Sequence, residues 1–442
     1  MSLVLTGGTV VRSLDPPTIS STDVVLNGER VGALGPSGAA GAPRIDCSGC
    51  LVIPGNVCSH HHLYSALARG MSYRLDPPET FLQILQRIWW RLDRALEPED
   101  VSLSAWAAGA DALLAGTTTV VDHHASPNAI EGSLDRIASA LGDLGLRSVL
   151  CYEVSDRDGP ERAEAGIEEN RRFLKRDDPL VRGMVGAHAS FTLSEETLAA
   201  CVDVARSAGV GVHVHVAEDG TDQRDARARF GTRVIHRLAE AGALDARAIL
   251  AHCVHVDERE AARIHETGAT VAHNARSNMN NRVGRAPIAG LGERLALGTD
   301  GIDGDLFAES RAAYWRAREA DASIQPDWAT RRVAAGAKLA GRLFGEPLLG
   351  RIEPQAPADL VVLAYDPPTP VSEGNIAGHW VFGISAANVR DVIVNGEVVV
   401  RDRRLTRGDR PDLPGRCREA AGSLWRRMEQ LPAHPFAPVG AP

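Results

Sequence analysis

The chain has 442 residues, of which 44% are hydrophobic and 24% charged, values typical of soluble globular proteins and not of disordered, collagen-like or membrane-spanning chains. Its 48 basic and 57 acidic side chains give a net charge of −9 without any basic run, so we expect a small-molecule substrate and no nucleic acid. No 18-residue apolar run occurs, the first residues lack the charged start and apolar stretch typical of a signal peptide, and the seven cysteines are scattered. We therefore expect a cytoplasmic protein without a membrane partner.

The first fifty residues have the pattern of short β-strands separated by turn residues, with β-rich segments at 3–11, 23–34 and 44–53. From residue 51 onward, apolar runs alternate with amphipathic stretches. Eight further strands are predicted, at 51–54, 117–122, 147–153, 181–187, 210–217, 248–253, 269–273 and 295–299. Helices are predicted between most of them, at 101–115, 128–144, 161–175, 195–207, 232–241 and 257–266.

This alternation indicates parallel βαβ units, and eight short apolar strands favour an α/β fold with a closed (β/α)₈ TIM-like barrel. The polar segment 274–285 is predicted to be a functional loop, because it is too rich in Asn and Arg for a helix core. Segments 358–363 and 389–400 return to β character. The predicted domains are a composite β-sandwich from 1–54 and 350–405, a barrel over 55–349, and a tail, 406–442, with a short helix near 419–428.

Histidines gather at the C-terminal ends of the predicted strands, where barrel active sites are built. The strand period of two places His60 and His62 on one face and His61 on the other. Such an H-x-H pair is weak evidence by itself. His215 on the fifth strand and Asp300 after the eighth complete a set of three imidazoles and one carboxylate, which suits Zn²⁺ or Fe²⁺.

The other histidines leave more room for purely structural roles. His213 points inward one pleat deeper than His215, so we expect it to be buried or to support a metal ligand. His252 is the first polar group after an apolar strand and is expected to be catalytic. His255 and His273 are open between supporting and structural roles.

Lysine is almost absent, and this bears on the number of metal ions. Two-metal barrels often bridge their ions with a carboxylated lysine at the end of strand four, a position that here reads Gly186-Ala187-His188-Ala189-Ser190. The only two lysines, Lys175 and Lys338, lie elsewhere. The sequence therefore predicts one divalent metal ion, with zinc preferred and iron as the second choice.

Several segments together resemble the amidohydrolase superfamily, specifically the mononuclear aminohydrolase branch with guanine deaminase, adenosylhomocysteine deaminases and triazine hydrolases. The matching segments occur in the expected order within residues 1–405, at 54–62, 116–119, 215–218, 250–255, 277–278 and 297–301. Within this branch, segments 68–71, 89–93 and 278–284 look most like the SsnA-type aminohydrolases. Departures from the common pattern at 274–276 and 301–305 concern substrate specificity.

The resemblance implies a barrel of the metal-dependent hydrolase type with a split β-domain. It also implies hydrolytic deamination (EC 3.5.4) of an amino-substituted N-heterocycle or cyclic amidine, such as a purine, pterin, pyrimidine or triazine. A metal-bound hydroxide would attack the carbon and ammonia would leave. The implied metal ligands are His60, His62, His215 and Asp300.

The same resemblance assigns three residues to catalysis. Asp300 would accept a proton from the attacking water. Glu218 would protonate the ring nitrogen and pass a proton to the departing ammonia, and His252 would hydrogen-bond the attacking oxygen. An alternative is a related amidohydrolase that releases chloride or an alkylamine, or opens a cyclic amide. A binding protein without activity is a third hypothesis, but all the implied ligands and proton-transfer residues are present.

Substrate binding is expected to involve residues near the predicted barrel mouth: His188, Arg69, Asn278, Arg276, Trp89 and Trp90. The two tryptophans could equally pack in the core, and each arginine could belong to a surface ion pair. Two arginines at the mouth would suit a substrate with a carbonyl or carboxylate. The family resemblance also implies a homodimer or larger homo-oligomer.

Overall fold

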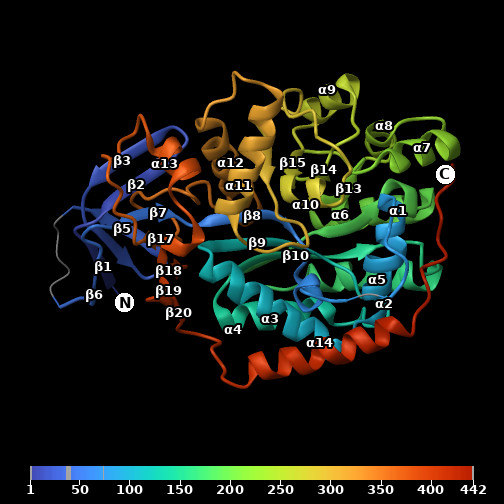
Figure 1. Ribbon diagram of the computed structural model, residues 1–442, viewed down its shortest axis with the longest axis horizontal. Helices are drawn as coiled ribbons and strands as arrows, with labels where there is room; N and C mark the ends of the chain where they lie inside the picture. The colour runs from blue at the N-terminus through green and yellow to red at the C-terminus, as the bar shows by residue number, and fades with distance from the viewer. Residues whose placement is uncertain (1, 36–40, 73, 441–442) are drawn as a thin grey trace.

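A barrel of eight parallel strands forms the centre of the computed structural model, which describes residues 2–35, 41–72 and 74–440 (Figure 1). Its strands pair in chain order, with the short β11 (Val181–Gly183) beside β10. The first and last strands are joined where the amide of Thr299 donates to the carbonyl of His60 at 2.9 Å. The eight strands are β8 (Asn56–His61), β9 (Thr117–His124), β10 (Arg147–Val154), β12 (Val185–Ala189), β13 (Val212–Val216), β14 (Ile249–His252), β15 (Thr270–His273) and β16 (Leu295–Leu297). The predicted nearly closed TIM-like barrel is confirmed.

Helices cover the outside of the barrel because each buries one apolar stripe against the strands. In α6, Ser194 caps the first turn by accepting a hydrogen bond from the amide of Thr197, and the helix ends at Gly209, whose φ is +69°. The main helices are α3 (Pro98–Leu114), α4 (Ser133–Leu144), α5 (Pro160–Phe173), α6 (Glu195–Ala208), α7 (Gly220–Phe230), α8 (Val234–Glu240), α9 (Glu258–Thr267), α11 (Leu306–Ala320) and α12 (Asp327–Phe344). Among the described residues, no helix has both the length and the apolarity to cross a bilayer.

The two ends of the chain form two further sheets beside the barrel, at the left of Figure 1. A four-stranded sheet contains, in spatial order, β5 (Arg30–Leu34), β4 (Val24–Asn27), β1 (Ser2–Thr6) and β6 (Arg44–Asp46). A seven-stranded sheet contains β20 (Arg404–Leu405), β19 (Glu397–Arg401), β18 (Val389–Val394), β17 (Leu360–Leu363), β7 (Leu51–Pro54), β2 (Thr9–Leu14) and β3 (Pro17–Ser21). Antiparallel pairing of β7 with β17 joins the two ends of the chain.

The strand pattern placed Leu51–Pro54 first among the barrel strands, which was wrong, whereas the predicted domain boundary after residue 54 assigned it to the β-sandwich. This segment is β7 of the seven-stranded sheet, and β8 is the first barrel strand. A buried run of four apolar residues has the same pattern in either sheet, so periodicity could not separate them. Gly55 lies between the two strands, where a Cβ atom would stand 2.1 Å from the hydroxyl oxygen of Thr118, and its missing side chain lets the chain pass from one sheet to the other.

Two other segments are more helical than predicted. The expected loop 274–285 contains a short helix, α10 (Ala275–Asn280), because its polar side chains find buried partners instead of solvent. The C-terminal helix α14 covers Leu413–Glu429 and is longer than the segment 419–428. Its apolar residues Leu413, Leu424 and Met428 are buried, and the helix packs on α3 and α2 (Trp90–Ala95) along the lower edge of Figure 1.

A buried ion pair connects the barrel to the seven-stranded sheet. Arg147 at the start of β10 donates from Nε and Nη2 to the two carboxylate oxygens of Asp359, at 2.9 and 3.2 Å, and both side chains are at most 3% exposed. We expect Arg147→Ala to lower the free energy of unfolding by about 3–5 kcal/mol, because the carboxylate of Asp359 would stay buried without its partner. Arg247→Ala is the control, since Arg247 forms an exposed pair with Asp245, and it should cost about 0–1 kcal/mol. Urea titration measures both, and equal losses would contradict the prediction.

Candidate metal centre and active site

Four potential metal ligands meet at the C-terminal end of the barrel strands. The Nε2 atoms of His60 and His62 lie 3.4 and 3.1 Å from Oδ1 of Asp300, and Nε2 of His62 lies 3.1 Å from Nε2 of His215. One donor atom of each of the four residues lies within 4.8 Å of the others. Three strands, β8, β13 and β16, deliver these groups to one point, which explains how residues 240 positions apart come together.

Hydrogen bonds at the opposite ring nitrogens hold the three imidazoles in this orientation. Nδ1 of His62 lies 2.6 Å from the carbonyl oxygen of His123, and Nδ1 of His215 lies 2.8 Å from that of His188. Nδ1 of His60 lies 2.9 Å from Nε2 of the buried His213, one pleat deeper in the barrel. These contacts leave the Nε2 atoms for a metal ion, and Nε2 of His60 is buried without a hydrogen-bond partner among the described residues. Three imidazoles and one carboxylate therefore fit a divalent ion.

The backbone at the site is held in an uncommon conformation. Asp300 has φ of +55° and His252 has φ of +72°, both in the left-handed region that side-chain-bearing residues rarely adopt. The hydroxyl of Ser277 donates to the second carboxylate oxygen of Asp300. His61, on the other face of its strand, is buried, with Nδ1 2.7 Å from the carbonyl oxygen of Asp300. Local strain thus aims the Asp300 side chain at the histidines.

Glu218 and His252 lie beside this cluster. Nε2 of His252 is 3.6 Å from Oε2 of Glu218, and Nδ1 of His252 is 2.8 Å from Oδ1 of Asn278. Asn281 donates to the other carboxylate oxygen of Glu218 at 3.3 Å. Burial raises the pKa of Glu218 to about 7 and outweighs the opposing effect of His252. A carboxyl group with a pKa near neutrality can both donate and accept a proton at physiological pH.

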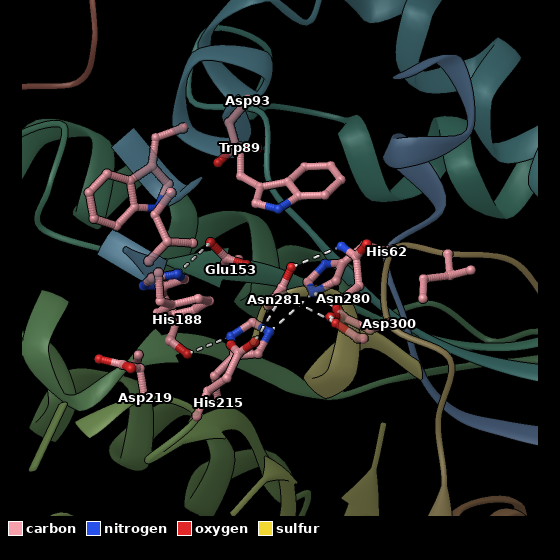
Figure 2. A pocket seen from close by; sticks show the side chains of 18 of the residues that line it. His62, Trp89, Asp93, Glu153, His188, His215, Asp219, Asn280, Asn281 and Asp300 are labelled. Carbon is pink, nitrogen blue, oxygen red and sulfur yellow. Dashed lines mark hydrogen bonds and ion pairs between the residues drawn. The ribbon is translucent and has the colours of Figure 1, made fainter. Parts of the chain in front are cut away.

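A cavity of about 460 Å³ lies next to this cluster. His62, His215, Glu218 and Asp300 are part of its lining, and Figure 2 shows Trp89 and Asp93 across the cavity from the histidines. Other lining residues include Phe81, Trp90 and Phe191, so much of the opposite wall is aromatic. The volume is typical of a site that encloses a small organic molecule.

The structure separates the six residues expected to bind substrate into two groups. His188, Arg69, Trp89 and Trp90 line the cavity, although Arg69 is also paired with Asp111 at 2.7 Å. Arg276 and Asn278 are not among the residues that line the cavity, and their role in substrate binding stays a prediction. Arg276 is bound by the carboxylates of Asp303 and Glu309, at 2.7 and 2.6 Å, and Asn278 contacts His252 instead.

A buried charged group that the sequence reasoning missed forms another part of the wall. Arg157 donates to Glu153 and to Asp93, at 2.8 Å each, and both of these carboxylates line the cavity. The neighbouring His188, Arg157 and His123 outweigh burial and hold the pKa of Glu153 well below its usual range, whereas burial raises the pKa of Asp93 to about 8. The available signal was a glutamate at the end of the apolar strand 147–153, next to the predicted barrel mouth.

Comparisons with known proteins place this site in a family. The amidohydrolase family model matches residues 51–399. A 5-methylthioadenosine/S-adenosylhomocysteine deaminase of Symbiobacterium thermophilum is 31% identical, over 96% of this chain and 99% of its own. A 5'-deoxyadenosine deaminase of Methanopyrus kandleri is 29% identical, over 85% of this chain and 86% of its own.

Solved structures agree with this placement. An adenosine deaminase from Xanthomonas campestris with bound zinc superposes with a TM-score of 0.83 at 26% identity, covering 97% of this chain and 99% of its own. An atrazine chlorohydrolase from Arthrobacter aurescens TC1, complexed with zinc, has a TM-score of 0.80 at 22% identity, covering 95% and 100%, and supports the fold alone. The chain belongs to the amidohydrolase family, and its predicted class, a metal-dependent aminohydrolase acting on nitrogen heterocycles, is confirmed.

Proposed function

We propose that this aminohydrolase removes the exocyclic 6-amino group of an adenine nucleoside. The observation that carries the proposal is the placement of Glu218 and Asp300 in the lining of a cavity whose other walls are aromatic and acidic, with His252 next to both. The curated relatives named above are deaminases of nucleosides of this class. They align with this chain over 96% and 85% of its length. An adenine ring fits between aromatic side chains, and ribose hydroxyls find acceptors in carboxylates.

In the reaction the oxygen of water is added to C6 and the amino group leaves as ammonia, so a carbonyl replaces the amino group. Glu218, in its protonated form, donates a proton to the ring nitrogen next to C6, which makes that carbon more electrophilic. Asp300 takes a proton from the attacking water, and His252 donates a hydrogen bond to the oxygen that is added. Glu218, now ionised, takes the proton of the added hydroxyl group and passes it to the amino group, so the oxygen becomes the carbonyl and ammonia leaves as the C–N bond breaks. The proton held by Asp300 then restores the protonated form of Glu218.

We also propose one zinc ion per chain, held by His60, His62, His215 and Asp300. When bound, zinc supplies a Lewis acid that lowers the pKa of water toward neutrality. A second set of donors, which adds His123 and Glu153 to His62 and His215, shares two ligands with the first. The ring nitrogens of His123 already contact Glu153 and the carbonyl oxygen of His213, at 3.1 and 3.0 Å, which favours a single ion.

Two finer assignments are proposals as well. Segments 68–71, 89–93 and 278–284 support a place among the SsnA-type aminohydrolases, and all three contribute lining residues to the cavity. Assembly as a homodimer or larger homo-oligomer stays a prediction, which the molar mass from light scattering tests.

Ammonia release from a panel of amino heterocycles tests the proposed activity. The zinc-loaded protein is incubated with adenosine, 5'-deoxyadenosine, 5-methylthioadenosine, guanine, pterin and an aminotriazine. We expect one equivalent of ammonia and one 6-oxopurine nucleoside from the adenine nucleosides. Ammonia only from guanine, pterin or the triazine would refute the nucleoside assignment while keeping the deaminase. Release of chloride or an alkylamine from substituted triazines, without ammonia from any compound, would favour the alternative hydrolase.

The pH dependence should report the protonation of Glu218. Because the protonated carboxyl is the active form, and burial raises its pKa to about 7, kcat/KM should fall as the pH rises through about 7. Below that pH the acid is already protonated, so this group contributes no further gain. Steady-state rates between pH 5 and pH 9, about two units below and above the expected pKa, give the profile. A kcat/KM that rises across pH 7 would contradict the assignment of Glu218 as the acid.

A further inference from the structure

Residues 432–440 are not a free tail. After α14, residues 432–440, here called the C-terminal strap, run along the side of the barrel and end beside α7 (Figure 1). The amide of His434 donates to the carbonyl of Gln86 at 2.8 Å, and the Gln86 side chain donates back to the carbonyl of Phe436 at 2.8 Å. The amide of Val439 donates to Asp225 on α7, also at 2.8 Å. The strap therefore links the segment after the first barrel strand to the helix after the fifth.

Two strap side chains pack behind the aromatic wall of the cavity. The ring of Trp90 lies 5.3 Å from that of His434 and 5.7 Å from that of Phe436, measured between centroids. Phe436 also lies 6.5 Å from Phe191. Trp90 and Phe191 line the cavity, and Trp90 contacts His188 at 6.1 Å as well. The strap thus supplies outer contacts for a wall whose inner surface faces the substrate.

A chain of polar contacts connects the strap to the acidic wall. The amide of Phe436 donates to Nδ1 of His434 at 3.1 Å, which leaves the proton on Nε2 to be donated to Asp158 at 3.3 Å. Asp158 lies 3.6 Å from Nε of Arg157. The other two nitrogens of that guanidinium hold Glu153 and Asp93, as described above. His434 itself is 3% exposed, so this contact is shielded from water.

The helix before the strap has its own anchors. The side chain of Trp425 donates to the carbonyl of Leu67 at 2.8 Å, and Arg427 donates to that of Ala95 at 2.9 Å. Arg91 donates to the carbonyls of Met428 and Leu431, at 2.7 and 2.9 Å. α14 can therefore stay in place when strap contacts are lost. Loss of those contacts should then affect the cavity wall and not the position of α14.

We propose that His434 and Phe436 are positioning residues that hold Trp90 and the pair Glu153 and Asp93 at the wall of the substrate cavity. This inference rests on the proposed function only in taking the cavity as the substrate site, and it does not depend on which heterocycle is bound. The metal ligands and Glu218 lie on other elements and make no contact with the strap among the hydrogen bonds and ring contacts described. Loss of strap contacts therefore weakens substrate binding and leaves zinc and the chemical step in place.

Steady-state kinetics of full-length, zinc-loaded variants test the inference. Phe436→Ala should raise KM roughly 3- to 10-fold, the equivalent of one lost aromatic contact, and change kcat by less than about twofold. His434→Ala should act in the same direction, and Phe436→Leu should restore most of the binding. Val439→Ala is the control, because this side chain is 53% exposed, and its KM should equal that of the unchanged protein. An unchanged KM in Phe436→Ala and His434→Ala, or a loss of bound zinc in both, would overturn the inference.

Hydrogen exchange gives a second measurement that needs no substrate. In Phe436→Ala and His434→Ala we expect faster amide exchange in segments 84–93 and 153–158, with unchanged exchange in β13 to β16. Unchanged exchange in both segments would contradict the positioning role even if the substrate panel fails. Failure of the panel with the expected exchange pattern would instead refute the proposed nucleoside activity and leave the strap inference standing.

Discussion

Glu218→Gln should reduce kcat by about 10²- to 10⁴-fold, the usual contribution of a positioned acid or base, while the protein keeps its metal. Glutamine has the same shape but can neither release nor take up a proton. It can still accept the hydrogen bond from Asn281, so the cavity wall should be preserved. The alkaline limb expected from the raised pKa of Glu218 should disappear with the carboxyl group. Steady-state rates and the zinc content of the same preparation measure both effects.

Glu240→Gln is the matched control for this variant, since Glu240 is exposed at the end of α8. It should have the kcat, KM and zinc content of the unchanged protein. Two results would refute the role of Glu218. One is a decrease in turnover of less than about threefold, because loss of an acid–base group should cause a far larger decrease. The other is a loss of zinc in parallel with activity. The second result would make Glu218 a metal ligand or a structural group.

The barrel could be predicted because its sequence pattern is repetitive and local. Each strand is a short apolar run, each helix has one apolar stripe, and parallel strands place their C-terminal ends on one face. For this reason His60, His215 and Asp300 could be expected at one point although they are far apart in the sequence. The first strand was misplaced because its four apolar residues would be buried equally well in the sheet formed by the chain ends.

Pairings between distant polar residues were not predictable in the same way. Two departures from the family pattern, at 274–276 and 301–305, are interpreted as specificity features, and the structure shows that they contact each other. Arg276 of the first binds Asp303 of the second and also Glu309 on α11. Burial of one charge requires its partners, so these positions are coupled, yet nothing in a single sequence indicates which acid an arginine will meet.

The C-terminal strap shows the same limit. Residues 432–440 are rich in proline and have no periodic pattern, which is the usual signature of an unstructured end. Their order comes from specific contacts made by His434 and Phe436 with Gln86 and Trp90, almost the whole chain length away. Such contacts leave no local signal, whereas a helix or strand repeats its signal along several residues.

Loss of a metal ligand should have the largest effect of all. His62→Ala removes one of three imidazoles from the predicted zinc site, so we expect zinc below about one tenth of an equivalent per chain and turnover below that of Glu218→Gln. Loss of a residue that only orients a metal ligand already costs about 10- to 100-fold in metal affinity, and loss of the ligand itself costs more. Chelation of the unchanged protein should have the same consequence, lower the melting temperature because a ligand that binds the folded state stabilises it, and be reversed by added zinc.

His61→Asn is the control for that experiment. His61 is adjacent to His62 but lies on the opposite face of the strand, where it contacts the backbone carbonyl of Asp300 and not the Nε2 atoms of the proposed ligands. It should retain about one zinc per chain, as expected for a site whose four proposed ligands are intact. Elemental analysis of both variants separates the two faces of β8. Full zinc in His62→Ala, or loss of zinc in His61→Asn alone, would mean that the strand presents the other histidine to the metal, and the predicted ligand set would be wrong.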